Sequence, residues 1–135
     1  MSVDTGVFSA SLRRKPHPTL TPLAARMVGQ QVGLAPQTVA ELRYGALVAG
    51  WGHGRRQRLE SAIAATTVIP MSDKLMTVVA ELRYACRRVG HPLANRAHTN
   101  DLWIAACAID SNAPLLTADG IFQDVPGLAH LRTTT

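Results

Sequence analysis

Two neighbouring stretches, NDLWIAACAI at residues 100–109 and PLLTAD at residues 114–119, decide the fold of this chain. The segment from Leu102 to Ile109 is apolar on nearly every face of a helix, which is typical of a helix packed inside a core. The second stretch contains a short apolar strand that ends just before Asp119. A buried helix that leads into a short strand predicts an α/β domain with helices packed on a sheet.

The same alternation of short apolar segments and helical patterns extends outward to both ends of the chain. Strands are predicted near residues 1–4, 32–36, 66–69, 114–117 and 130–132. Helices are predicted over residues 7–12, 21–31, 38–49, 53–65 and 72–89, with Thr21, Thr38 and Ser72 at N-termini and Gly90 after the last. Because parallel neighbouring strands need helical crossovers, this order predicts a mainly parallel sheet.

The composition indicates one globular domain. The length of 135 residues and the 47% hydrophobic content are enough for a sizeable core, and no apolar run reaches the roughly 18 residues that a membrane span requires. The N-terminus lacks a basic segment followed by an apolar one, so we expect a cytoplasmic protein. Cys86 and Cys107 lie within apolar helical patterns and are expected to be buried thiols.

Four carboxylates lie where a predicted strand gives way to a helix or a turn. Asp4 follows the first strand, Glu41 follows the second, Asp101 begins the buried helix, and Asp119 follows the strand at 114–117. In parallel α/β sheets, ligands gather beyond the carboxyl ends of the strands. We therefore expect the four acids to share one edge of the sheet.

Each acid also has a purely structural interpretation. Asp4 could cap the first helix, and Thr38 with Glu41 fits a capping box. Asp101 suits the positive end of its helix dipole, and Asp119 precedes a glycine, as in an ordinary turn. Capping does not require that all four acids share one edge, so the coincidence favours a functional cluster.

Such a cluster has a definite chemistry. Clustered carboxylates repel one another, and a bound cation relieves the repulsion. Oxygen ligands suit Mg²⁺ or Mn²⁺, which retain waters and bridge phosphate oxygens. These ions lower the pKa of a bound water and stabilise charge on the leaving oxygen of a phosphodiester. The four acids therefore predict metal-dependent hydrolysis of a nucleic-acid backbone.

Four blocks of the sequence resemble the signature blocks of the PIN domain, in particular of VapC-type ribonuclease toxins of bacterial toxin–antitoxin pairs. They span nearly the whole chain in the right order and read VDTGVFSA from residue 3, TVAELRYGA from residue 38, HPLANRAHTNDLWIAACAI from residue 91 and PLLTADGIFQDVPGL from residue 114. The resemblance implies one PIN domain over residues 1–135 with a three-layer α/β/α fold. It also implies a homodimer and a cognate VapB-like antitoxin that blocks the site.

By the same resemblance, Asp4, Glu41, Asp101 and Asp119 match the acidic quartet that binds Mg²⁺ or Mn²⁺. Thr5 and Thr117 match hydroxyl residues that support the metal shell. The sequence departs from the family pattern at Ile121, where toxins of this group often carry a further acid, and Asp124 lies two residues beyond the next phenylalanine. The number of metal ions is therefore left open, as is a contribution from Asp124.

Basic residues exceed acidic ones by 14 to 9, which favours a polyanionic partner. Two clusters are candidates for contact with the RNA backbone: Arg13, Arg14 and Lys15 in a proline-broken loop that could approach the acidic edge, and Arg55 and Arg56 in the helix at 53–65. Aromatic residues are few and not interleaved with these clusters, so no stacking platform is expected.

The hexapeptide VAELRY occurs twice, at residues 39–44 and 79–84, without matching flanks. It places Glu41 beside a strand end and Glu81 in the middle of a helix, so only Glu41 is expected to serve the site. His98, three residues before Asp101, is expected to lie near the same site.

The sequence thus predicts a metal-dependent endoribonuclease toxin. Two alternatives remain open at this point: a PIN nuclease that acts in RNA processing or on DNA, and a catalytically inactive PIN-like module that binds RNA or protein.

Overall fold

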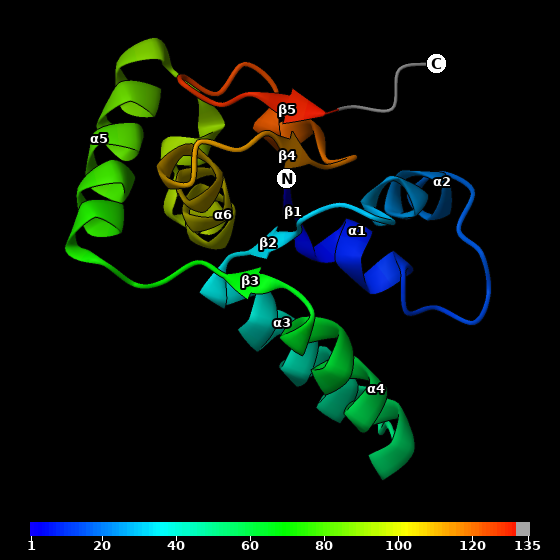
Figure 1. Cartoon of the computed structure of the whole chain (residues 1–135). Helices are drawn as coiled ribbons and strands as arrows, with labels where there is room; N and C mark the ends of the chain where they lie inside the picture. The colour runs from blue at the N-terminus through cyan, green and yellow to red at the C-terminus, as the bar shows by residue number, and fades with distance from the viewer. Residues whose placement is uncertain (132–135) are drawn as a thin grey trace.

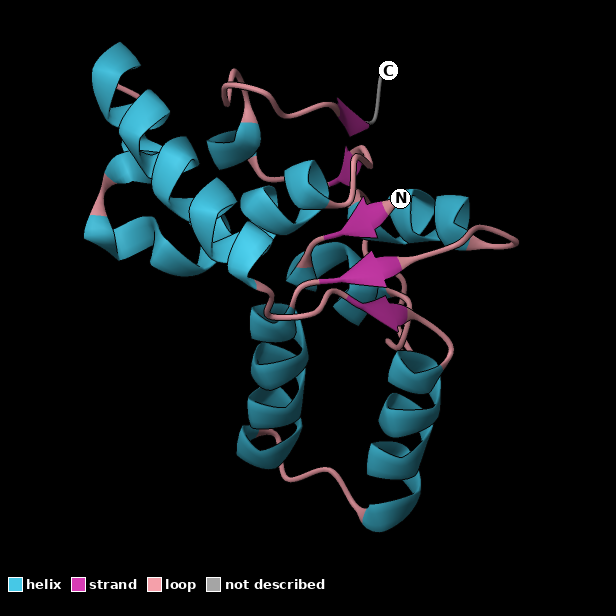
Figure 2. Ribbon diagram, turned by 60° about the vertical axis from the view of Figure 1, so that its left-hand side comes forward, coloured by secondary structure: helices cyan, strands magenta, loops and turns pink. Residues whose placement is uncertain are grey.

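Five short parallel strands form the centre of the fold (Figures 1 and 2). The computed structural model describes residues 1–131, so Arg132, the predicted end of the last strand, lies outside the described residues. The strands lie in the order β3-β2-β1-β4-β5, and all four neighbouring pairs are parallel. Their bounds are β1 (Ser2–Val3), β2 (Gly33–Leu34), β3 (Thr67–Val68), β4 (Leu115–Leu116) and β5 (His130–Leu131).

Helices connect these strands and cover both faces of the sheet (Figure 1). Their bounds are α1 (Thr5–Ala10), α2 (Leu20–Ala24), α3 (Pro36–Val48), α4 (His53–Ala64), α5 (Asp73–Val89) and α6 (Thr99–Asp110). Figure 2 shows α3 and α4 extending side by side away from the strands.

Two apolar clusters fill the space on either side of the sheet. One contains α5, α6 and Leu115, and the other contains α1 to α4 and Leu116. Leu115 and Leu116 are adjacent in β4 and fully buried, because successive side chains of a strand point to opposite faces. In the described part of the chain, the parallel sheet therefore lies between two layers of helices, which confirms the predicted three-layer α/β/α fold.

Several predicted boundaries are confirmed by the hydrogen bonds at helix ends. Ser72 accepts a hydrogen bond from the Leu75 amide at the start of α5, and Gly90 ends that helix in the left-handed conformation, at a φ of 71°.

Cys86 and Cys107 are buried free thiols, as predicted, and burial raises the pKa of Cys107 to about 12.

Two predicted helix starts are wrong, for a local reason in each case. The helix predicted over 21–31 is the five-residue α2 followed by a 3-10 turn at Ala25–Met27, and the Thr21 hydroxyl accepts from the His17 amide instead of capping. The helix predicted from Thr38 begins at Pro36, a residue whose fixed φ suits the first turn.

Within the described part of the chain, no helix is both long and apolar enough to span a membrane.

Candidate active site

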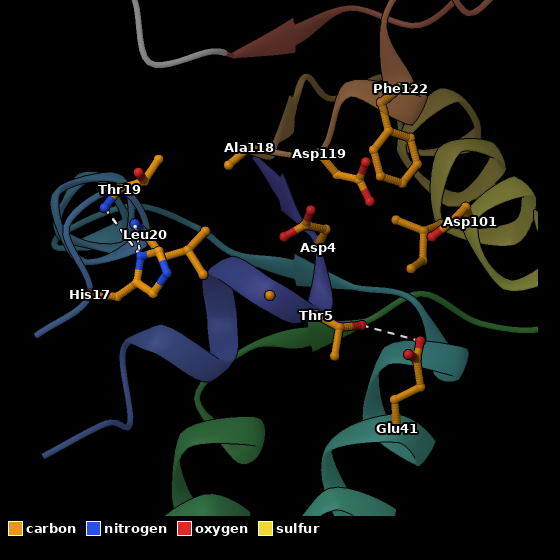
Figure 3. A pocket seen from close by; sticks show the side chains of 12 residues that line it. Asp4, Thr5, His17, Thr19, Leu20, Glu41, Asp101, Ala118, Asp119 and Phe122 are labelled. Atoms are coloured by element: carbon orange, nitrogen blue, oxygen red, sulfur yellow. Dashed lines mark hydrogen bonds between the residues drawn. The ribbon is translucent and has the colours of Figure 1, made fainter. Parts of the chain in front are cut away.

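The four acids predicted from strand ends line one cavity of about 530 Å³ (Figure 3). Each comes from a different segment: Asp4 from the end of β1, Glu41 from α3, Asp101 from the first turn of α6, and Asp119 from the segment after β4. The parallel sheet brings them together because β1 and β4 are neighbours and end at the same edge.

Asp4 is the most buried of the four, with 7% of its surface exposed. Its Oδ1 accepts a hydrogen bond from the Val7 amide at 2.9 Å, which caps α1, and its Oδ2 accepts one from the Thr117 hydroxyl. The structural interpretation of Asp4 as a helix cap is therefore correct. It does not compete with a functional role, because the carboxylate also lines the cavity.

Thr117 connects Asp4 to Asp119. Its hydroxyl donates to Asp4 and accepts from the Asp119 amide at 3.0 Å, and its side chain is 2% exposed. Asp119 in turn accepts from the Ile121 amide at 3.0 Å and caps the 3-10 turn at Gly120–Phe122. One buried hydroxyl thus fixes the positions of two of the four acids.

Glu41 lies in the second turn of α3, because the helix begins at Pro36. The capping box expected from Thr38 and Glu41 is absent: Ala35 is the N-cap residue, and Thr38 is buried in the first turn. The Thr5 hydroxyl donates to Glu41 Oε1 at 3.2 Å and lies 3.1 Å from the Thr38 hydroxyl. Thr5 therefore positions one acid, whereas Thr117 positions two.

Asp101 lies beside a histidine from the preceding 3-10 turn, Arg96–His98. The distance between His98 Nδ1 and Asp101 Oδ2 is 3.4 Å, so His98 lies where the sequence predicts it. His98 does not itself line the cavity. Asp101 lies in the first turn of α6, where the helix dipole favours negative charge.

Burial and mutual repulsion raise the pKa values of three of the acids. Desolvation is the largest cause for Asp4, Glu41 and Asp101. The charges of Asp101 and Asp119 raise the pKa of Asp4 further, and the charges of Asp101 and Asp4 raise that of Glu41. The hydrogen bonds from Thr117 and Thr5 act in the opposite direction. The four acids are thus close enough to form one electrostatic unit.

This oxygen-only set fits a hard divalent cation by its chemistry. Among the described residues, no three histidine, cysteine, aspartate or glutamate side chains already stand in positions to hold an ion. Cation binding would therefore require the carboxylates to turn toward one another. Asp124 does not line the cavity; it is exposed, with a φ of 60°.

The cationic clusters predicted to bind RNA do not line the acidic cavity. The loop after α1 does reach it, but through His17, Thr19 and Leu20 rather than through Arg13, Arg14 and Lys15. Arg14 and Arg55 line a separate cavity of about 360 Å³, and Arg56 lies in another, between α3 and α4.

Two aromatic rings lie against arginines in the structure, although they are not interleaved with the basic clusters in the sequence. The guanidinium of Arg55 lies 3.9 Å from the centre of the Trp51 ring, and that of Arg88 lies 5.8 Å from the Tyr84 ring. The stacked pair Trp51 and Arg55 lines the cavity that also contains Arg14.

Sequence reasoning missed His17 and Phe122 in the acidic cavity, because neither residue follows a strand end.

Comparison with known proteins identifies the family of this site. The PIN-domain family model matches residues 1–128. Ribonuclease VapC5 of Mycobacterium tuberculosis is 32% identical over 131 residues, which cover 96% of this chain and 90% of that protein.

Solved structures share the fold. VapBC2 of Rickettsia felis bound to a promoter DNA fragment gives a TM-score of 0.76 at 23% identity, with 97% of this chain and 96% of that chain covered. FitAcB of Neisseria gonorrhoeae gives 0.76 at 23% identity, with 96% of each chain covered. VapBC-5 of Mycobacterium tuberculosis gives 0.67 at 28% identity, with 97% and 96% covered. With four acids in one cavity at the end of a parallel sheet and a family match over residues 1–128, this chain belongs to the PIN-domain family.

Proposed function

We propose that this chain, as one PIN domain over residues 1–135, is a metal-dependent endoribonuclease toxin of the VapC type that inhibits translation in the cytoplasm. The observation that carries the proposal is the meeting of four carboxylates from four separate segments in one cavity. The 32% identity to a VapC ribonuclease over nearly the whole chain supports RNA as the substrate.

In this proposal Asp4, Glu41, Asp101 and Asp119 hold Mg²⁺ or Mn²⁺, directly or through water, and Thr5 and Thr117 keep the carboxylates in place. The bound ion would supply an activated water and charge stabilisation at the leaving oxygen of the phosphodiester. The chain's own residues fix the geometry: the Thr117 hydroxyl orients Asp4 and Asp119, and the Thr5 hydroxyl orients Glu41.

The charge distribution supports an RNA substrate. When the four site acids are set aside, five acids remain against 14 basic residues elsewhere on the chain. A basic body attracts the phosphate backbone through a sequence-independent electrostatic force. We propose that Arg14 and Arg55, which share a cavity, bind RNA outside the catalytic cavity, with Arg13, Lys15 and Arg56 adding to the positive surface.

We further propose that the chain forms a homodimer and is neutralised by a VapB-like antitoxin. Large apolar side chains are exposed at the C-terminal half of α3, where Tyr44, Leu47 and Val48 are 63 to 69% exposed. Such side chains are available to pack against a partner helix. A partner that also presents a positive side chain would complement the acidic cavity and block it.

The two copies of VAELRY provide a matched pair of substitutions for testing the site. Glu41→Gln removes a carboxylate from the cavity, and we expect RNA cleavage by the purified protein in Mn²⁺ to fall at least a hundredfold, since metal-site residues act in the reaction itself. Glu81→Gln changes an exposed glutamate of α5 and should leave the rate near that of the wild type. Equal effects would contradict the site assignment, and cutting that survives EDTA would indicate an inactive module with a contaminating nuclease.

The raised pKa values predict how charge and metal affect stability. A carboxyl whose pKa is higher in the folded than in the unfolded chain favours folding when the pH is below its unfolded pKa. This contribution to stability is lost as the pH rises through the folded pKa. At neutral pH without metal, Asp4→Asn should therefore raise the melting temperature by a few degrees, since about 1 kcal/mol corresponds to roughly 4 °C in a domain of this size. Asparagine retains the helix cap through Oδ1, and its amide group can donate to the Thr117 hydroxyl in place of accepting from it.

Differential scanning fluorimetry at several pH values checks this expectation. The gain of Asp4→Asn should shrink on acidification, and Mn²⁺ should stabilise the wild type more than Asp4→Asn. A metal-free Asp4→Asn protein that melts below the wild type and responds equally to Mn²⁺ would show that the acids do not form a cation site.

Expression in bacteria separates a toxin from a processing nuclease. We expect induced expression of the wild type to arrest growth with new 5′ ends in cellular RNA, and co-expression of the small protein encoded beside it to relieve the arrest. Induced expression of Asp4→Asn should neither arrest growth nor produce new 5′ ends. New RNA ends without growth arrest would favour RNA processing, and DNA breaks without RNA ends would favour a DNA substrate.

A further inference from the structure

The loop between α1 and α2 holds one imidazole in a fixed orientation at the acidic cavity. His17 Nδ1 accepts hydrogen bonds from the backbone amides of Thr19, at 3.1 Å, and Leu20, at 3.0 Å. The His17 amide donates to the Thr21 hydroxyl at 2.7 Å, and its carbonyl accepts from the Thr21 amide at 3.1 Å. Backbone and ring are thus both anchored to the first turn of α2.

These bonds determine which ring nitrogen carries the proton. A nitrogen that accepts two N–H groups uses its lone pair and has no proton of its own, so the proton of the neutral ring is on Nε2. Nε2 is therefore a hydrogen-bond donor. It has no lone pair for a metal ion and cannot accept a proton from a water, which excludes a role for His17 as a metal ligand or general base in this arrangement.

A second histidine shows the same local structure with its donor already used. His17 and His91 both precede a proline, and His91 Nδ1 accepts from the Leu93 amide at 3.0 Å. The Nε2 of His91 then donates to the Gln123 carbonyl at 2.8 Å, so both bonds require the same tautomer. For His17 no partner of Nε2 exists among the described residues, and the ring lines the acidic cavity instead.

His17 is the one residue with a side-chain nitrogen among the twelve that line this cavity. The others contribute carboxylates, hydroxyls or hydrocarbon, apart from one glycine. Figure 3 shows the anchored nitrogen on the side of the Thr19 and Leu20 amides, with the other ring nitrogen on the side of the Leu20 side chain, beyond which Asp4 and Asp119 lie in this view. A donor opposite a set of acids suits a ligand whose acceptor oxygens reach His17 directly and the acids through a bound cation.

We propose that His17 binds the RNA substrate by donating a hydrogen bond from Nε2 to a non-bridging phosphate oxygen of the backbone beside the cleaved bond. The inference rests on the proposed nuclease function and adds a substrate-binding residue to it. An ionised phosphate oxygen is a stronger acceptor than a ribose hydroxyl, and it is present at every nucleotide. His17 thus positions the backbone, while the four acids serve the cleavage step.

His17→Asn tests this role without removing the loop's anchor. Asparagine can accept the same amides through Oδ1, as in an Asx turn, but has no group at the position of Nε2. The matched control is His91→Asn, in which the lost Nε2 bond lies outside the acidic cavity. Both changes are introduced into the full chain carrying Glu41→Gln, and binding of a short fluorescein-labelled single-stranded RNA is measured by anisotropy in Mn²⁺.

We expect His17→Asn to weaken RNA binding about tenfold, the lower end of what a hydrogen bond to a charged group contributes, and His91→Asn to leave it unchanged. The melting temperature and the Mn²⁺ affinity, measured by calorimetry, should not change with His17→Asn. Unchanged RNA binding, or a loss that follows the melting temperature, would overturn the inference, and a loss of Mn²⁺ affinity would make His17 a metal ligand. RNA cleavage by the wild type is scored separately, so a protein that binds RNA through His17 without cutting it contradicts only the proposed function.

Discussion

The carboxylate of Asp4 is the contact on which the rest of the site depends. It accepts from the first turn of α1 through Val7 and from the end of β4 through Thr117, so one buried group links the first strand, the first helix and a strand more than a hundred residues later. Burial without these two hydrogen bonds would be costly for a carboxylate. With them, the charge is held at the edge of the sheet, and its pKa is still raised by desolvation and by the neighbouring acids. The same bonds that complete the fold therefore leave a charge that a cation would neutralise.

This arrangement explains how one acid can cap a helix and line the cavity at the same time. Asp4 and Asp119 are helix caps, and both line the cavity. A cap places an acid at the N-terminal end of a helix, and in a parallel sheet the helices that follow the strands begin at one edge. The fold thus gathers acids by the same local rules that begin its helices. The hydroxyls of Thr5 and Thr117 then set the direction of each carboxylate.

Strand ends and apolar periodicity were enough to predict the parallel sheet and the common position of four acids, and the two helix layers were implied by the family resemblance. The sequence could not predict features that depend on contacts between distant segments. Trp51 and Arg55 are four residues apart, yet their stacking depends on the first turn of α4, and Arg14 joins them only through the fold. His17 was missed because its role depends on two amides that hold Nδ1, and a histidine before a proline looks the same at His91. The start of α3 was misplaced because Thr38 hydrogen-bonds with Thr5, 33 residues away, instead of capping its own helix.

If the acidic cavity holds a divalent cation, anomalous diffraction from crystals of the protein grown with Mn²⁺ will locate the ion there. Manganese scatters anomalously, so its position is found without assumptions about the side chains around it. We expect a peak within ligand distance, about 2.0–2.4 Å, of carboxylate oxygens from at least two of Asp4, Glu41, Asp101 and Asp119, with the remaining ligands supplied by water. A cavity with no peak at saturating Mn²⁺, or a peak bound only by residues outside this cavity, would contradict it.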